Sequence, residues 1–129
     1  MKEKLDIIFS KFIRLRDTDE YGYGECITCG WLFGYKDLEA GHFRHRRHLG
    51  TRWEEKNVHA QCIPCNREDD LCAYIIAMMN RYDEDEVNEI IQLSQLNCKP
   101  TMQEISEMYQ VYRAKVKDLL VDKMFLIQY

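Results

Sequence analysis

The chain is 129 residues long, which suits one domain with a modest buried core. Its net charge of −4 argues against a generally basic nucleic-acid binder, and no apolar run is long enough to span a membrane. Six cysteines occur without a leading signal region of basic and then apolar residues, so an oxidising compartment is not supported. We expect a cytoplasmic protein with reduced thiols.

The first predicted element is an amphipathic helix over residues 3–16. Its apolar residues recur at helical spacing and form one stripe: Leu5, Ile8, Phe9, Phe12 and Ile13. The acidic run at 17–20 ends this helix, and residues 21–24 lead as an extended segment into the first cysteine pair.

Two Cys-x2-Cys pairs enclose every histidine of the chain. They are formed by Cys26, Cys29, Cys62 and Cys65. A two-residue gap lets both sulfurs of one turn reach the same ion, and four thiolates complete a closed tetrahedral shell for Zn2+. We therefore predict a structural zinc site; a redox pair is the alternative, which two such pairs around a hairpin fit less well. The other thiols, Cys72 and Cys98, are expected as small core residues.

The segment between the cysteine pairs is predicted to be a β-hairpin with a basic loop. One strand is expected over residues 38–43 and the other over about 57–61. From His42 to Arg52 the chain holds four arginines, three histidines and no acid, so the remainder carries −8. This segregation can focus a polyanion onto the cationic segment. A solvated loop paired with Glu54 and Glu55 is the alternative.

Helices are predicted after the second cysteine pair. A helix over about 66–82 carries an apolar stripe that we assign to the core: Leu71, Tyr74, Ile75, Met78, Met79 and Tyr82. Acids at 83–86 complement the dipole of the next helix, which buries Val87, Ile90 and Ile91 and ends near 97–100. A capping box, Thr101-x2-Glu104, opens the last helix. The expected fold is α+β, as a single domain over 1–129: an N-terminal helix in 1–20, a core in 21–82 and C-terminal helices in 83–129.

The order of these parts resembles the HNH, or ββα-metal, endonucleases, and within them most of all the phage NinG recombination-protein family. The resemblance covers about a third of the chain and rests on Cys26-x2-Cys29, Ala40-Gly-His-Phe43, Arg52-Trp53 and Asn57-Val-His-x-Gln-Cys-x2-Cys-Asn66. Phage endonuclease VII, which cuts branched DNA, is similar more distantly, with four zinc-binding cysteines and an asparagine after the last. The resemblance implies a small zinc-stabilised ββα-metal (HNH) core with flanking amphipathic helices.

The same resemblance implies metal-dependent hydrolysis of DNA phosphodiester bonds, in a bacterial or phage-infected cell. By matching position, His42 is the general base, Asn57 fixes the loop and thereby the imidazole, and Asn66 binds a catalytic Mg2+ or Mn2+. A histidine with a pKa near 6.5 suits removal of a proton from water at neutral pH. In the alternative assignment, His42 is a metal ligand and another group is the base.

One position departs from the HNH pattern. Many HNH sites carry an acid or a histidine directly before the base, as a second metal ligand, and here that position is Gly41. Strand alternation places Glu39 on the face opposite His42. We therefore expect His59, on the second strand, to oppose His42 across the hairpin and to join the catalytic metal site, with His45 as a substitute.

The basic loop supplies the predicted DNA contacts. Guanidinium groups bind phosphate oxygens through paired donors, so four side chains are expected at DNA: Arg44, Arg46, Arg47 and Arg52. Arg52 matches the family pattern and is also assigned to stabilise the transition state. A solvated surface is the alternative for Arg46 and Arg47.

The predicted function is endonucleolytic cleavage of branched, Holliday-junction-like DNA, and the preference for branches rests on the resemblance alone. Two cuts at one junction suit a C2 homodimer, for which the amphipathic terminal helices are candidate surfaces. The alternatives are a nuclease of plain duplex DNA, an inactive HNH-like module that only binds DNA, and a zinc-built interaction protein.

Overall fold

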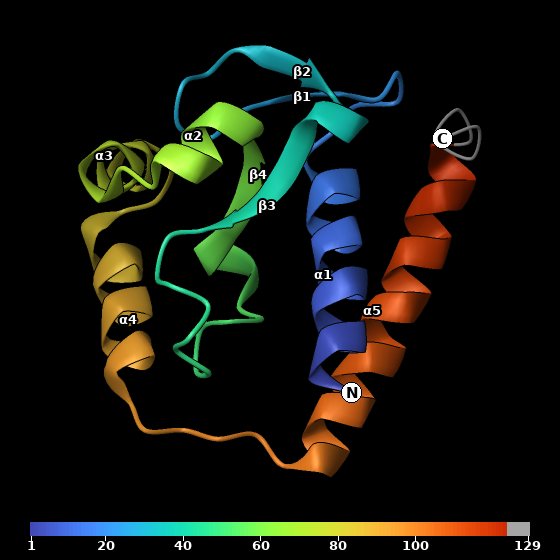
Figure 1. The fold of residues 1–129 in the computed structure, drawn as a ribbon, viewed down its shortest axis with the longest axis vertical. Helices are drawn as coiled ribbons and strands as arrows, with labels where there is room; N and C mark the ends of the chain where they lie inside the picture. The colour runs from blue at the N-terminus through green and yellow to red at the C-terminus, as the bar shows by residue number, and fades with distance from the viewer. Residues whose placement is uncertain (124–129) are drawn as a thin grey trace.

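The computed structural model describes residues 1–123, which form two groups of helices on either side of a β-hairpin (Figure 1). In the hairpin, β3 (Leu38–His42) pairs antiparallel with β4 (Val58–Cys62). A smaller hairpin of β1 (Tyr23–Glu25) and β2 (Leu32–Gly34) carries the first cysteine pair between its strands. The α+β class is therefore confirmed, whereas the strand β2 was not predicted from the sequence.

The helices are as long as their sequence patterns suggest, with one exception. They are α1 (Lys2–Arg16), α2 (Ile63–Glu68), α3 (Leu71–Arg81), α4 (Glu84–Gln95) and α5 (Met102–Asp122). Both α4 and α5 begin with a complete capping box, in which the side chains of residues 83 and 101 accept from the backbone three residues on. The predictions for α1, α4 and α5 are confirmed. None of the helices described within residues 1–123 is long and apolar enough to cross a membrane.

The exception is the single helix expected over 66–82, which is interrupted between α2 and α3. Asp69 adopts the left-handed conformation with φ 53° and ends α2. Asp70 then caps α3, because its side chain accepts from the backbone N–H of Ala73 at 3.1 Å. Aspartate is among the few residues that tolerate the left-handed conformation found at Asp69. It is also a preferred N-cap residue, the role that Asp70 has. The break redirects the chain and gives α3 its own orientation.

The terminal helices α1 and α5 pack against each other along one side of the hairpin (Figure 1). Their apolar stripes meet in a cluster with residues of the hairpin region: Leu5, Phe9, Phe12, Ile13, Leu15, Trp53, Val58, Ile105, Tyr112 and Val116. The rings of Phe9 and Tyr112 meet edge to face at 4.9 Å between centroids. These stripes pack against each other within the chain, and the homodimer expected from the sequence stays a prediction.

A second apolar cluster joins α3 and α4 to the end of β3. Its buried members are Phe43, Tyr74, Met78, Val87 and Ile90. Only one face of α3 takes part, and Leu71, Ile75 and Met79 remain 52%, 36% and 47% exposed. Cys72 and Cys98 are also exposed. The prediction that these five side chains belong to the core is therefore wrong.

Candidate functional site

Four cysteine sulfurs converge beside β4, within 4.8 Å of one another. The turn between β1 and β2 supplies Cys26 and Cys29, while Cys62 ends β4 and Cys65 lies in α2. Gly30, at φ 77°, closes the first turn through a bond from its N–H to the carbonyl of Cys26. Four soft ligands in this arrangement fit a structural Zn2+. The predicted convergence of the four cysteines into a cluster that could bind a metal is confirmed.

Within the cysteine cluster, burial raises the pKa of Cys62 and Cys65, whereas the pKa of Cys26 is lowered, so the thiolate that binds metal forms first at Cys26. Burial raises the pKa of the Cys26 thiol, but backbone N–H groups, chiefly those of Cys29 and Cys62, outweigh burial and lower it to about 7. The backbone N–H of Cys29 lies 3.5 Å from the sulfur of Cys26. A thiolate held by N–H donors needs little further reorganisation to bind a cation.

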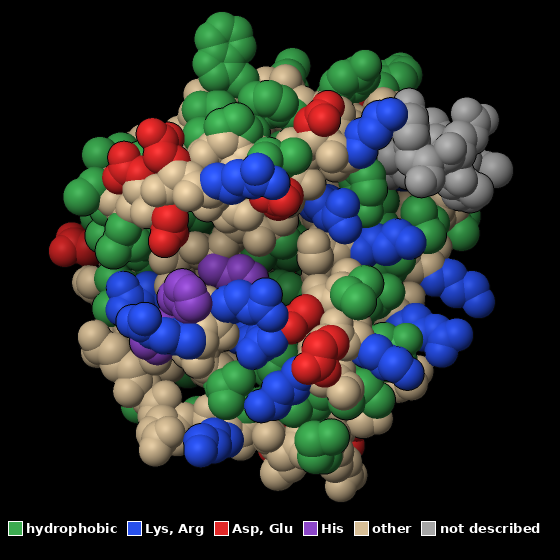
Figure 2. Space-filling model, in the orientation of Figure 1, with side chains coloured by type: hydrophobic (Ala, Val, Ile, Leu, Met, Phe, Trp, Pro, Cys, Tyr) green, Lys and Arg blue, Asp and Glu red, His purple; other side chains and the backbone are tan. Residues whose placement is uncertain are grey.

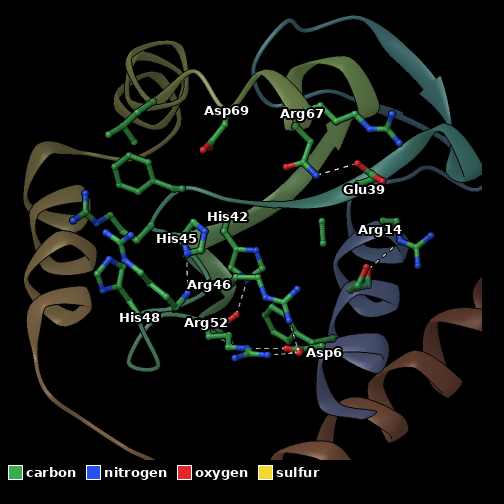
Figure 3. A pocket seen from close by; sticks show the side chains of 18 of the residues that line it. Asp6, Arg14, Glu39, His42, His45, Arg46, His48, Arg52, Arg67 and Asp69 are labelled. Carbon is green, nitrogen blue, oxygen red and sulfur yellow. Dashed lines mark hydrogen bonds and ion pairs between the residues drawn. The ribbon is translucent and has the colours of Figure 1, made fainter. Parts of the chain in front are cut away.

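A cleft of about 970 Å³ extends along β3, bordered by α1, α2 and the basic loop (Figure 3). Seven of the residues predicted for catalysis or DNA binding line it: His42, Arg44, His45, Arg46, Arg47, Arg52 and Asn66. In Figure 2, basic side chains (Lys and Arg share one colour) and histidine side chains gather around this part of the surface. The sequence-based grouping of these residues is thus reproduced in space.

His42 sits at the end of β3 with its ring held in one orientation. Its Nε2 lies 2.9 Å from the carbonyl oxygen of Arg52. A carbonyl only accepts, so Nε2 carries the proton and Nδ1 keeps a lone pair. Burial lowers the pKa of His42 below 6.5, so the ring is neutral at neutral pH. This is the protonation state that a general base requires.

Asn57 is fully buried and ties together the two ends of the basic loop. Its Oδ1 accepts from the backbone N–H of Arg44 at 2.7 Å. Its Nδ2 donates to the carbonyl oxygens of Arg44 and Thr51, at 3.1 and 2.9 Å. The side chain therefore fixes the loop that carries Arg52, in agreement with the role expected from the sequence.

His59 lies elsewhere, and the prediction that it opposes His42 is wrong. The register pairs His42 with Val58 and Gly41 with His59, which puts the two histidines on opposite faces of the hairpin. His59 is 1% exposed, and its Nε2 lies 2.7 Å from the hydroxyl of Tyr82. It does not line the cleft. Its role in the described structure is that of a buried, hydrogen-bonded core residue.

The buried state of His59 predicts a loss of stability in acid. Burial and the charge of Arg16 lower its pKa to about 3, whereas the unfolded chain binds a proton near 6.5. Stability therefore falls as the pH drops below 6.5, by about 2 kcal/mol at pH 5 from this group. Urea unfolding in excess Zn2+ at pH 7.5 and 5 will show a smaller pH effect in His59→Gln than in the unsubstituted protein. Equal pH effects in both would contradict this assignment.

Glu39 is a site residue that strand alternation led us to exclude. It lines the cleft with His42, and its Oε1 accepts from the Nδ2 of Asn66 at 3.0 Å (Figure 3). The sheet has only two strands, so one edge of β3 is unpaired. Side chains on either face of β3 can therefore reach a cleft that runs along its unpaired edge. Strand alternation predicts the face on which a residue lies, but not whether its side chain reaches that edge.

Gly41 has no room for the acid that many HNH sites carry there. A Cβ at this position would lie 2.0 Å from the Oε1 of Gln61. The Gln61 side chain is itself held, because its Nε2 donates to the hydroxyl of Thr28 at 2.8 Å. The departure from the HNH pattern at residue 41 therefore has a steric cause, and Glu39 is the carboxylate beside Asn66 instead.

Asp6 of α1 is the second cleft residue that sequence reasoning missed. It accepts from the Nε and Nη2 of Arg52, from Nη2 of Arg46 at 2.9 Å and from the indole N–H of Trp53 at 3.0 Å. The guanidinium of Arg52 is thus bound to a carboxylate, and its side chain is only 15% exposed. Asp6 is 40 to 47 positions away in the sequence from the residues that it binds, so no local sequence pattern indicates this network.

The other arginines of the loop differ in how freely they face solvent. Arg44 donates from Nε to the hydroxyl of Ser94 on α4 at 3.0 Å. The side chain of Arg46 is 57% exposed despite its contact with Asp6, and Arg47 is exposed. Arg46 and Arg47 are therefore the loop cations most open to a polyanion.

Together these features define a small α+β protein in which a cluster of four cysteines that could bind a metal adjoins a hairpin bordered by a cationic cleft. The chain belongs to the NinG family, since the family model described as Bacteriophage Lambda NinG protein matches residues 1–122. It is also similar to Protein ninG of Salmonella phage P22, with 32% identity over 111 residues, or 84% of this chain and 52% of the relative. The chain thus spans about half the length of that relative. No solved structure matches it significantly.

Proposed function

We propose that this NinG-family protein is a metal-dependent DNA endonuclease of the HNH type that cuts branched DNA. The observation that carries the proposal is the neutral, oriented His42 in a cationic cleft shared with Glu39 and Asn66. In this reading β3, β4 and α2 are the ββα core. Hydrolysis of a phosphodiester needs a base for water, a cation for the developing charge and groups that hold the backbone.

His42 supplies the base. Its Nδ1 takes a proton from the attacking water, while Nε2–H stays bonded to the carbonyl of Arg52. That carbonyl stabilises the imidazolium that forms, because a cationic ring donates more strongly. Asn57 contributes at a distance, since it holds the loop to which Arg52 belongs.

Glu39 and Asn66 would hold the catalytic metal. Glu39 offers the carboxylate oxygen that Asn66 does not contact, and the amide oxygen of Asn66 is a second hard ligand. Two oxygen ligands with water at the other positions suit Mg2+, or Mn2+ as a substitute. When bound, the metal neutralises charge on the phosphorane and on the leaving oxygen.

The exposed cations of the loop would hold the DNA backbone. Arg46 and Arg47 line the same cleft as His42, and a net −8 on the remainder of the chain concentrates the attraction for phosphate at this segment. The preference for branched DNA is supported by the resemblance to phage endonuclease VII in the four cysteines and in the asparagine after the last one.

Cleavage of an end-labelled four-way junction and of a matched linear duplex tests the proposal. Zinc-loaded protein will cut the junction near the branch in Mg2+ and not in EDTA. His42→Ala will slow cleavage by roughly 100-fold or more, the range of general-base losses. His48→Ala is the matched control, because His48 lines the same cleft without contacting the base, and it will cut within about threefold of the unsubstituted rate.

Each other outcome selects a different function. Equal cutting of junction and duplex would leave a nuclease without a branch preference. Junction binding without cutting in Mg2+ or Mn2+ would replace the enzyme with a DNA-binding module. No salt-dependent binding of DNA would point to a zinc-built interaction protein.

A further inference from the structure

Asp6, which lines the cleft, connects α1 to the basic loop (Figure 3). Its two carboxylate oxygens accept from Arg46, Arg52 and Trp53, and Arg52 alone provides two of the donors. The Arg52 guanidinium also lies over the Trp53 ring, 5.1 Å from its centroid. One carboxylate thus fixes the positions of consecutive residues 52 and 53.

The same residue, Arg52, touches the base through its backbone. Its carbonyl oxygen lies 2.9 Å from the Nε2 of His42. Asp6 is therefore linked to His42 through Arg52 alone. The side chain of Arg52 binds Asp6, and its main-chain carbonyl binds His42.

We propose that Asp6 is a positioning residue, which holds Arg52 so that the Arg52 carbonyl keeps the His42 ring oriented with Nδ1 available in the cleft. This inference rests on the proposed function of the cleft. Asp6 touches neither water nor substrate in this role, and acts only through Arg52.

The negative charge of Asp6, considered alone, predicts that replacing Asp6 would not lower the cleavage rate. A carboxylate in a cleft that binds a polyanion repels phosphate and neutralises two arginines. If that were its whole effect, its removal would strengthen DNA binding and leave or raise the cleavage rate. A positioning role predicts instead a loss in kcat without a loss in binding, so the two accounts differ in sign.

The test is junction cleavage by Asp6→Asn, which removes the charge and keeps the shape. We expect kcat to fall by roughly 10- to 100-fold, the cost of a displaced catalytic group, while KM stays equal or decreases. Glu3→Gln is the matched control: Glu3 lies one turn away on α1, is exposed and pairs with the N-terminal amine. It loses the same charge and will cleave at the unsubstituted rate. Cleavage by Asp6→Asn at that rate or faster would overturn the inference.

A second variant covers the case in which Asp6→Asn does not fold. Arg52→Lys keeps the positive charge and the backbone carbonyl but loses the two-pronged contact with Asp6. The same loss in kcat is expected, and full activity in a folded Arg52→Lys protein would also refute the role of Asp6.

A readout without cleavage separates this inference from the proposed function. In proton NMR of the zinc-loaded protein, the His42 Nε2–H is expected as a slowly exchanging resonance in the unsubstituted and Glu3→Gln proteins. It will be lost or broadened in Asp6→Asn. If no variant cuts DNA but this difference is seen, the nuclease fails and the positioning by Asp6 stands. If the resonance persists in Asp6→Asn, the inference fails whatever the activity.

Discussion

Replacing Cys62 with serine will abolish cooperative folding of the hairpin region, not only metal binding. Cys62 is 3% exposed, ends β4 and pairs with Leu38 of β3, so the metal site and the strand pairing share this residue. A structural zinc site contributes on the order of 10 kcal/mol to folding, which is comparable to the whole stability of a small domain. Thermal unfolding followed by circular dichroism, with zinc content measured in parallel, will show a low or absent transition.

Cys72→Ser is the matched control for this loss. Cys72 is exposed on α3 and lies outside the four-cysteine cluster. Its replacement will leave the zinc content and, within about 0.5 kcal/mol, the stability unchanged. Removal of zinc from the unsubstituted protein with a chelator will reproduce the Cys62→Ser result. A Cys62→Ser protein that melts like the original would show that the cluster does not stabilise the fold.

The parts of the structure that were predictable depend on short-range chemistry. Each cysteine pair forms a tight turn because only two residues separate its members, and the capping box of α5 sits at Thr101 and Glu104, where the sequence places it. The apolar stripe of α1 is buried for the same reason, since helical spacing alone puts its members on one side. Local rules suffice wherever a few neighbouring residues decide the conformation.

The parts that were missed depend on register, edges and distant partners. In the observed register His42 pairs with Val58 and not with His59, the next residue of β4. The residue pattern of the strands did not determine this register. Asp6 joins the site across 46 residues, through a contact that exists only after α1 has packed on the hairpin. The exposed face of α3 follows from the break at Asp69, which a continuous apolar pattern concealed. In each case tertiary packing, and not the local sequence, determined the register, the contact or the exposed face.

Glu39→Gln will separate metal binding from DNA binding at the cleft. Glutamine keeps an oxygen that can accept from Asn66 but loses the charge that a divalent cation requires. We expect Mg2+-dependent cleavage to fall by roughly 100-fold or more, and DNA binding in EDTA to hold or strengthen because one negative charge leaves the cleft. Calorimetric titration with Mn2+ will show weaker binding in this variant.

Asp37→Asn provides the control, because Asp37 lies two residues away, is exposed and does not line the cleft. It will cleave and bind Mn2+ as the unsubstituted protein does. Restoring the HNH pattern with Gly41→Asp will not compensate for the loss of Glu39, since the new Cβ overlaps the held side chain of Gln61 and destabilises the hairpin. Undiminished Mg2+-dependent cleavage by Glu39→Gln would remove Glu39 from the metal site. Rescue by Gly41→Asp in that variant would mean that the cleft accepts its carboxylate at residue 41 after all.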